Sequence, residues 1–441
     1  MEEENNPIEY FEGKPKNVFR YKNFTLAFLG ALVSNLGNIL YNFAVSFFIL
    51  KLTDNNAFIQ GAYLATGGIV YVLFTLFGGA ISDRFHKGKI MYTCDYLKGG
   101  VIIGFTLLLM FAFKDATSQV VVLFILAVIT NIIAAIFAPA AASLMPHIVP
   151  GQSIQQAQSY YSAMQSSLSI LGVVLAGILY SVLPINTFFI IVGACYVLSG
   201  VSEMFIRYNH QKKEEKLTIN VVFSDIGDGF KYLVRLKPIF YILGAILFVN
   251  FFFSPISSNF LPYFIEADIA PSDYLFKSFM EPEMWQSIFS VAMGIGMIVM
   301  ALILSTKKTA ERIIKPLRIS IVVFVALAIL LTTSYVLFAN NVINVNALLI
   351  TDVVIILLMG ASLALINIPM TSKVMTTVDK EKLGKVSSVI DIGSQGLIPF
   401  ATFLAGLVIS GLGPMWLLII STTGLVLACT VILVNKQIGK L

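Results

Sequence analysis

The stretch GGAISDRFHKGKIM (residues 78–91) places four charged side chains between two long apolar runs. Only 12% of the 441 residues are charged and 57% are hydrophobic, with a mean hydropathy of +0.86. In a soluble domain, about 25% of the residues are charged. A chain this apolar is predicted to be an integral membrane protein, and the charged stretch is predicted to be a short loop between two of its spans.

Twelve apolar runs have the length of about 20 residues that a helix needs to cross a hydrocarbon core ~30 Å thick. Backbone polar groups in lipid must be satisfied within their own segment, and these runs are too long for barrel strands, so each run is predicted to be a helix. The expected fold class is all-α, with helix ends placed to within about four residues. The expected transmembrane helices span residues 24–50, 57–81, 89–113, 119–142, 160–183, 185–206, 239–265, 285–305, 318–339, 347–370, 388–410 and 414–435.

The positive charges predict the orientation of these helices. Of the 29 Lys and Arg residues, 25 fall in the two tails and in alternate connections between helices, and Lys98 lies within a span. The other connections hold only Lys51, Lys114 and Lys277. Short cytoplasmic segments are enriched in Lys and Arg, so both termini are predicted to be cytoplasmic, on the same side as residues 78–91. Residues 1–23 mix five Glu with four basic residues and are not expected to be a cleavable signal peptide.

A self-comparison indicates an internal repeat. A shift of 229 residues aligns LAGIL (175–179) with LAGLV (404–408) without a gap. Such a match predicts two pseudo-symmetric six-helix bundles, with chance similarity among apolar residues as the alternative. Within the linker, apolar residues recur at helical spacing, which predicts an amphipathic helix on the membrane surface. The expected domains are a tail (1–23), two bundles (24–206 and 239–435), a linker (207–238) and a C-terminal tail (436–441).

Together these features resemble the major facilitator superfamily. Residues 78–91 look like the signature of the loop between its second and third spans, although His86 stands where the signature usually has Gly. IFAPAAASLMPHIVPGQSIQQAQS (136–159), LGKVSSVIDIGSQGLIPFATFLAG (383–406) and SDIGDGFKYLVRLKP (224–238) are similar to the branch with macrolide-efflux and enterobactin-export proteins. The resemblance implies secondary active transport by alternating access.

The resemblance also implies that the charged loop is a conformational latch that closes the cytoplasmic side. Gly79 permits close helix packing. In this hypothesis Asp83 faces the N-terminal end of the eleventh span, a contact worth ~0.3 to 1 kcal/mol when exposed and up to ~2 kcal/mol when partly buried. The alternative is that the loop charges only anchor the orientation. The latch candidates are Gly79, Asp83, Arg84, Lys87, Lys89 and Asp95, the last as an ion-pair partner of Arg84 or Lys89.

Several amides are expected at the depth where such carriers bind substrate, near the middle of the bilayer. At ~1.5 Å per residue, Asn35, Asn131 and Asn250 lie about 16 to 18 Å into their spans. Asn38 and Asn42 follow Asn35 on one helix face. Hydrogen bonding between helices is the alternative role for each amide. The cavity candidates are Asn35, Asn38, Asn42, Asn131, Gln165 and Asn250.

No fixed charge is expected at this depth. Intramembrane acids are functional candidates by default. Asp95, Glu203 and Asp391 are expected toward the cytoplasmic ends of their helices, with Lys98, and Asp352 is expected toward the outside. The four acids are therefore candidates for proton coupling. Snorkelling toward the membrane surface or helix capping is the alternative for each.

The predicted function is a secondary active transporter that exports hydrophobic or amphipathic small molecules, such as macrolide-like drugs, with proton antiport as the candidate energy source. A lipid or siderophore transporter of the same fold and a transport-like membrane sensor are the alternatives. Without a GxxxxGK[ST] loop the chain is not expected to be a primary pump, and without an HExxH motif or a His within a span it is not expected to be an enzyme.

The expected partners are a small-molecule substrate, the lipid bilayer and protons. The three Cys and three His residues have no metal-ligand spacing, so no metal and no cofactor are expected. Nucleic acid is not an expected partner. The chain is predicted to act as a monomer in a bacterial cell membrane.

Overall fold

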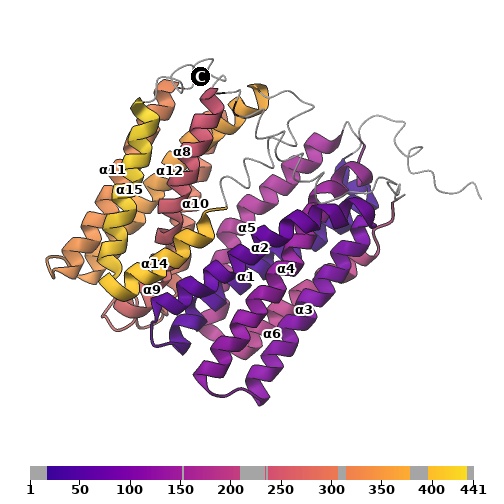
Figure 1. The fold of residues 1–441 in the computed structure, drawn as a ribbon, viewed down its shortest axis with the longest axis horizontal. Coiled ribbons are helices and arrows are strands. Elements are labelled where there is room, and N and C mark those ends of the chain that lie inside the picture. Colours follow the sequence, from indigo (N-terminus) through magenta and orange to yellow (C-terminus); the bar gives the residue numbers. More distant parts are fainter. Residues whose placement is uncertain are drawn as a thin grey trace, which may run out of the picture. The chain divides into compact units, whose positions relative to one another are not determined.

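The computed structural model describes residues 17–150, 153–208, 234, 237–305, 314–377 and 396–434, and these are helical almost throughout, with no strand among them (Figure 1). The first six helices are α1 (Lys22–Leu52), α2 (Ala57–Arg84), α3 (Lys87–Phe111), α4 (Ala116–Ile148), α5 (Ile154–Val182) and α6 (Ile185–Met204). The later helices are α8 (Lys237–Pro255), α9 (Leu261–Phe264), α10 (Met284–Ser305), α11 (Ile314–Ala339), α12 (Val345–Thr377), α14 (Ile398–Leu412) and α15 (Pro414–Val434).

These helices correspond to the twelve expected spans. Ten helices of the described chain are long and apolar enough to cross a membrane. The seventh span is α8 and α9 joined by a π-helical turn, and a second such turn carries the helical run on to Ile269. The eleventh span is the shorter apolar helix α14. The expected all-α membrane fold is confirmed, although the start of the eleventh span and the amphipathic linker helix lie outside the described residues.

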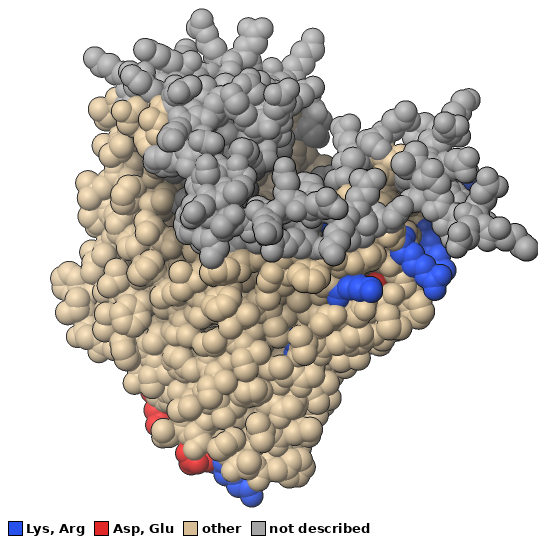
Figure 2. Space-filling model, turned by 45° about the vertical axis from the view of Figure 1, so that its right-hand side comes forward, with Lys and Arg blue, Asp and Glu red and all other residues tan. Residues whose placement is uncertain are grey.

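The surface of the described chain suits contact with lipid. Leu171, Val182, Leu302, Leu427 and Val434 lie on three helices, α5, α10 and α15, and are each between 64% and 73% exposed. Figure 2 shows one face of the molecule, on which charged side chains gather near two ends and a broad surface between them carries almost none. Exposed apolar side chains on this scale would cause a soluble protein to aggregate, whereas hydrocarbon is their matching solvent.

The chain forms two compact units. The N-unit contains Met1–Val45 and Thr66–Leu217, and the C-unit contains Ser46–Ala65 and Thr218–Leu441. Residues 46–65, which the sequence assigns to the first bundle, pack within the C-unit. Lys51 in this segment forms an ion pair with Glu283.

The close approach of helix backbones explains this packing. A Cβ atom on Gly61 would lie 2.7 Å from the carbonyl oxygen of Thr402 and 2.8 Å from Cα of Gly406. Because neither glycine has a side chain, α2 and α14 can touch through their backbones, as small residues allow between membrane helices. Residues 46–65 therefore join the C-unit through backbone contact as well as through an ion pair.

Equivalent helices of the two halves cross in the same way. In the N-unit, a Cβ atom on Gly78 of α2 would lie 2.1 Å from the carbonyl oxygen of Ala135 on α4. In the C-unit, a Cβ atom on Gly296 of α10 would lie 1.9 Å from the carbonyl oxygen of Leu357 on α12. These pairs are the second and fourth spans of each half. Their shared glycine crossing agrees with the repeat found in the sequence.

Candidate functional site

A cavity of about 960 Å³ lies within the N-unit and is lined by residues of α1 to α6. Sites for small molecules usually measure about 300 to 1,000 Å³, so this cavity can hold a bulky solute. Its apolar lining comes largely from α4 and includes Ile133, Phe137, Met145 and Ile148. Its polar lining consists of Ser34, Asn35, Asn38, Tyr41, Asn42, Tyr71, Asp95, Lys98, Thr130, Asn131, Tyr161, Gln165 and Tyr196.

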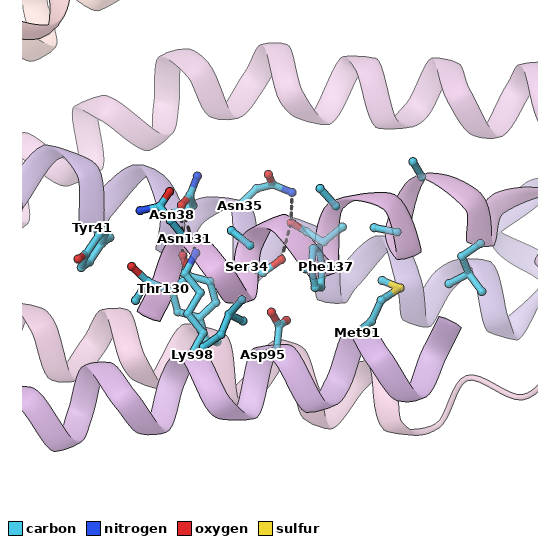
Figure 3. A pocket seen from close by; sticks show the side chains of 18 of the residues that line it. Ser34, Asn35, Asn38, Tyr41, Met91, Asp95, Lys98, Thr130, Asn131 and Phe137 are labelled. Atoms are coloured by element: carbon cyan, nitrogen blue, oxygen red, sulfur yellow. Dashed lines mark hydrogen bonds between the residues drawn. The ribbon is translucent and has the colours of Figure 1, made fainter. Parts of the chain in front are cut away.

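The polar stripe of α1 faces this cavity, because Asn35, Asn38 and Asn42 all line it. Figure 3 shows Asn35 and Asn38 on this helix. Nδ2 of Asn35 donates to the backbone oxygen of Ala31 at 2.7 Å. The oxygen of the same amide accepts a hydrogen bond from Nε2 of Gln165 on α5, at 3.3 Å. The Asn35 amide thus ties α5 to α1 at the cavity wall and is held in one orientation.

Asn131 lines the cavity from α4, where its Nδ2 donates to the backbone oxygen of Ala127 at 2.9 Å. A Cβ atom on Gly67 of α2 would lie 2.8 Å from this nitrogen, so the glycine makes room for the amide. Asn250 does not line this cavity, because it belongs to α8 of the C-unit. The structure therefore brings five of the six candidate amides to one cavity, and their part in substrate binding stays a prediction.

The expectation that no fixed charge lies at this depth is wrong. Asp95 and Lys98 both line the cavity from α3, and both are largely buried, with 3% and 8% of their surface exposed. The helix begins at Lys87, so these residues lie ~12 Å and ~16 Å along it, close to the middle of a ~30 Å core. The sequence alone places them too near the helix end.

Lys98 has polar and aromatic neighbours at the cavity wall. Its Nζ lies 3.5 Å from Oδ1 of Asn38, and 4.5 Å from the centroid of the Tyr196 ring. The Tyr196 hydroxyl donates to the same Asn38 oxygen at 3.4 Å. Figure 3 shows Lys98 reaching from α3 toward Asn38, with Asp95 beside it on the same helix. Three helices, α1, α3 and α6, thus meet around one ammonium group.

Glu203 on α6 is fully buried and does not line the cavity. Among the described residues, neither of its carboxylate oxygens has a hydrogen-bond partner. Its carboxyl group is close enough to that of Asp95 for the two charges to repel each other. A Cβ atom on Gly30 of α1 would lie 2.8 Å from Cγ of Glu203, so α1 rests directly on this side chain. A buried carboxylate without hydrogen bonds is costly unless a proton neutralises it.

The other two acids expected to couple protons lie elsewhere. Asp352 is buried on α12 of the C-unit, where the hydroxyl of Ser334 on α11 donates to its Oδ1 at 2.6 Å. This contact joins two helices, which is one of the ordinary roles of a polar side chain in a membrane protein. Asp391 lies outside the described residues.

The loop between α2 and α3 holds the latch candidates. The surroundings of Gly79 and the side chains of Asp83 and Arg84 lie outside the described part of the structure. Lys89 is exposed, and the described chain contains no ion pair between it and Asp95. Asp95 faces the cavity, eight residues beyond Lys87, instead of reaching the loop. The expected pairing of Asp95 with Lys89 is therefore absent from the described residues, because the carboxylate lies ~12 Å along α3.

His86 and Tyr208 order this loop instead. His86 caps α3, because its Nδ1 accepts a hydrogen bond from the Lys89 amide at 3.3 Å. The Tyr208 ring lies 4.3 Å from the His86 ring and 5.3 Å from that of His147. Burial raises the pKa of Tyr208, so its hydroxyl stays neutral and accepts a hydrogen bond from the Lys87 amide at 2.7 Å. The His at the usual Gly position therefore has a structural role.

Removal of the Tyr208 hydroxyl tests this description. Tyr208→Phe keeps the ring contacts and deletes the partner of the Lys87 amide, so we expect the free energy of unfolding to fall by about 0.5 to 1.5 kcal/mol. Thermal unfolding of the purified protein in detergent measures this loss. Tyr241→Phe is the matched control, because Tyr241 is 44% exposed on α8. Equal stability of the two variants would contradict the assigned hydrogen bond.

Two cavity residues that the sequence did not single out are Tyr41 and Tyr196. An aromatic residue in an apolar span carries no signal of its own, because most such residues face lipid or the core. The position of Lys98 did carry a signal. It is the only Lys or Arg residue in the interior of an expected span, since Lys89 and Arg318 stand at the first residues of theirs, and a count from the start of α3 places it near the middle.

Two halves of six helices with equivalent glycine crossings, and a polar cavity large enough for a drug-sized solute, define a multi-pass membrane transporter. The sequence pattern of the Major Facilitator Superfamily matches residues 27–402. The chain belongs to this superfamily.

Similar proteins agree with this class. The chain is 24% identical to an uncharacterized MFS-type transporter, YkuC, of Bacillus subtilis (strain 168), and the match covers 72% of each chain. It is 22% identical to Macrolide efflux protein A of Streptococcus pyogenes, over 95% of this chain and 98% of the relative. A crystal structure of a bacterial homologue of the iron transporter ferroportin in an inward-facing state has the same fold. Its TM-score is 0.68 at 15% identity, over 93% of this chain and 98% of the other.

Proposed function

We propose that the protein is a secondary active transporter that exports hydrophobic or amphipathic small molecules, macrolide-like drugs among them, by alternating access and proton antiport. It works as a monomer with both termini in the cytoplasm. The observation that carries the proposal is the cavity of about 960 Å³, with polar groups on α1 and α3 and apolar side chains along α4. The similarity to Macrolide efflux protein A supports export as the direction.

The cavity chemistry suits a solute with one polar end and a large apolar body. Amide groups of Asn35, Asn38 and Asn131 supply hydrogen bonds, whereas residues 133–148 of α4 supply an apolar wall. This wall is ~22 Å long at 1.5 Å per residue. Small-molecule sites commonly combine a mostly apolar lining with a few polar groups that fix orientation. A sugar phosphate or a small ion would leave the apolar wall unused.

Proton coupling is assigned in this proposal to Glu203 and Asp95. Glu203 is buried without a hydrogen-bond partner in the described chain, and Asp95 interacts electrostatically with both Glu203 and Lys98. Two carboxyl groups that repel each other share protons more readily than an isolated one. An ionised Glu203 would be a buried charge without hydrogen bonds, which costs free energy. In this proposal the transport cycle therefore loads and releases the proton of Glu203.

Transport in inverted membrane vesicles tests the function. We expect vesicles with the protein to accumulate labelled erythromycin when their lumen is acidic, and to lose it when a protonophore removes the gradient. Vesicles with Asp83→Asn are expected to contain as much inserted protein and to transport less, because the latch is weakened. Drug susceptibility of cells with either variant gives a second readout.

Three results would each contradict part of the proposal. Binding of erythromycin without its movement into the vesicles would favour a membrane sensor. Erythromycin movement that does not depend on the proton gradient would show that the protein is a transporter but not a proton antiporter. Unchanged transport by Asp83→Asn would remove the latch from the mechanism.

A further inference from the structure

We propose that the Lys98 end of the cavity is a subsite for a carboxylate, so that amphipathic solutes with an anionic group bind the proposed transporter more tightly than neutral or cationic ones. The inference rests on the proposed function for the direction and energy of transport. The subsite itself is a binding property of the N-unit. The donors that meet at Lys98 and the apolar wall beside them support it.

The Lys98 ammonium group is a buried cation, and some of its N–H donors are available to a ligand. No ion pair within 4.0 Å involves it in the described chain. An ammonium group has three N–H donors. One is directed to Asn38 Oδ1 at 3.5 Å, which is a long hydrogen bond, and the ring of Tyr196 lies 4.5 Å from Nζ. Because Lys98 also lines the cavity, an anion in the cavity can take the remaining donors and compensate the buried charge.

Asn38 supplies the second donor of the subsite. Its Oδ1 accepts from both Lys98 and the Tyr196 hydroxyl, so the amide nitrogen is the group left for a ligand. Asn38 lines the cavity, and its side chain is exposed there. A carboxylate has two oxygens and accepts hydrogen bonds from two donors at once. An ammonium group and an amide nitrogen on neighbouring helices, α3 and α1, match this requirement.

Asp95 sharpens the choice of ligand. It lies one helical turn before Lys98 and lines the same cavity, but the two side chains form no ion pair within 4.0 Å. Oδ2 of Asp95 has no hydrogen-bond partner among the described residues. An anion is therefore repelled from the Asp95 side and directed to the Lys98 side. A cation near Lys98 would be repelled by the ammonium group. The charges of Asp95 and Lys98 therefore orient a charged solute along α3.

The apolar part of the cavity places the rest of the solute. From Ile133 to Ile148, the α4 lining consists of Ala, Ile, Leu, Met and Phe residues. A carboxylate at Lys98 leaves its apolar body free to lie along this wall. Figure 3 shows Lys98 and Asn38 close together, with Phe137 and Met91 farther along the cavity. The subsite thus favours an amphipathic anion over a small anion.

Three fluorescent probes with a shared reporter group test the subsite in the wild-type protein. They are dansyl-phenylalanine, which is a carboxylate, its neutral carboxamide, and dansyl-cadaverine, which is a cation. Binding to the purified full-length protein in a non-ionic detergent is measured by the increase in dansyl fluorescence. We expect the carboxylate to bind about tenfold to a hundredfold more tightly than the carboxamide, as charge-assisted hydrogen bonds imply. Equal or weaker binding of the carboxylate, or none, would overturn the proposal.

Variants at position 98 locate the preference. Lys98→Met removes the charge at similar length and is expected to weaken only the carboxylate, by about tenfold to a hundredfold, with the carboxamide changed less than about twofold. Lys98→Arg keeps the charge and the preference. Lys114→Met is the matched control, because Lys114 is exposed in the segment between α3 and α4. If Lys98→Met still preferred the carboxylate over the carboxamide, the preference would come from a group other than Lys98.

The two proposals fail in different ways. If the vesicles transport erythromycin but the protein does not prefer the carboxylate probe, the subsite is wrong and the transporter stands. If the carboxylate binds through Lys98 but neither erythromycin nor dansyl-phenylalanine moves in the vesicles, the subsite stands and the transport function is wrong. The wild-type comparison of probes needs no variant, so poor folding of a substituted protein leaves the test decisive.

Discussion

Replacing Glu203 by Gln is expected to abolish proton-driven accumulation of solute while the exchange of solute across the membrane continues. The Gln side chain mimics a protonated Glu, so the carrier can still change conformation but can no longer exchange a proton at this site. One charge that crosses 100 mV supplies ~2.3 kcal/mol, and 1.36 kcal/mol corresponds to a factor of ten. The loss of one coupled proton should therefore lower the accumulation ratio ~50-fold per 100 mV.

The surroundings of Glu203 are the reason for this expectation. The side chain is fully buried, and the carboxylate oxygens have no hydrogen-bond partner among the described residues. The hydroxyl groups of Ser199 and Ser202 donate to backbone oxygens of α1, each at 2.8 Å, so α1 and α6 are held together around Glu203. Gln fills nearly the same volume and carries no charge. It should therefore fold at least as well as the protonated native side chain.

Proteoliposomes with an imposed membrane potential provide the measurement. Accumulation of labelled erythromycin reports coupling, and counterflow without a gradient reports the conformational cycle. Glu281→Gln is the matched control, because Glu281 is an exposed residue in the segment before α10. Accumulation by Glu203→Gln at the wild-type level would refute the assignment. A loss with Asp352→Asn instead would move the proton site to the C-unit.

An anionic solute would change the energetics of proton antiport. Export of one negative charge in exchange for entry of one proton moves two charges in the direction that an inside-negative potential favours. At ~2.3 kcal/mol per charge and 100 mV, the potential then contributes ~4.6 kcal/mol per cycle. Lys98 and Glu203 would have separate tasks in such a cycle, since one binds the solute and the other the proton. This separation predicts that Lys98→Met alters solute preference without loss of proton coupling.

The sequence predicted the fold well because membrane helices are specified by long apolar runs and by loop charges. Those signals are local, so twelve helices and the repeat could be recognised without coordinates. The assignment of residues 46–65 was harder. Its packing in the C-unit depends on Gly61 facing Gly406, and a contact between residues so far apart in the chain leaves no local pattern.

The candidate site was predicted in part for a related reason. Depth along a helix follows from a residue count, and that count placed Asn35, Asn131 and Asn250 at one level. Asn35 and Asn131 line one cavity, whereas Asn250 does not. Asp95 and Lys98 were expected toward the cytoplasmic end of their span, whereas they lie ~12 Å and ~16 Å along α3. A residue count also does not give the direction in which a side chain points. The hydrogen bond from Lys98 to Asn38 forms only if these residues lie on the faces of α3 and α1 that contact each other. Tertiary packing determines those faces.

Replacing Gly360 by Ala is expected to be among the most damaging single-methyl changes in the described chain. A Cβ atom at this position would lie 2.0 Å from the carbonyl oxygen of Met293 and 2.8 Å from its carbonyl carbon. Both atoms belong to the backbone of α10, so no side chain can rotate away. The two helices must separate, and overpacking of this kind costs about 1 to 3 kcal/mol, occasionally more. Gly360→Val should cost more again, because it adds two methyl groups at the same crossing.

Gly244→Ala is the control for this change, because a Cβ atom on Gly244 of α8 meets nothing within 4 Å. Ala is the better helix former by about 0.5 to 1 kcal/mol, so this variant should match or exceed the stability of the native protein. The opposite signs of the two effects separate backbone crowding from helix propensity. Thermal unfolding in detergent, with the yield of monodisperse protein, measures both variants. If Gly360→Ala were as stable as Gly244→Ala, α10 and α12 would not cross as closely as their backbones indicate.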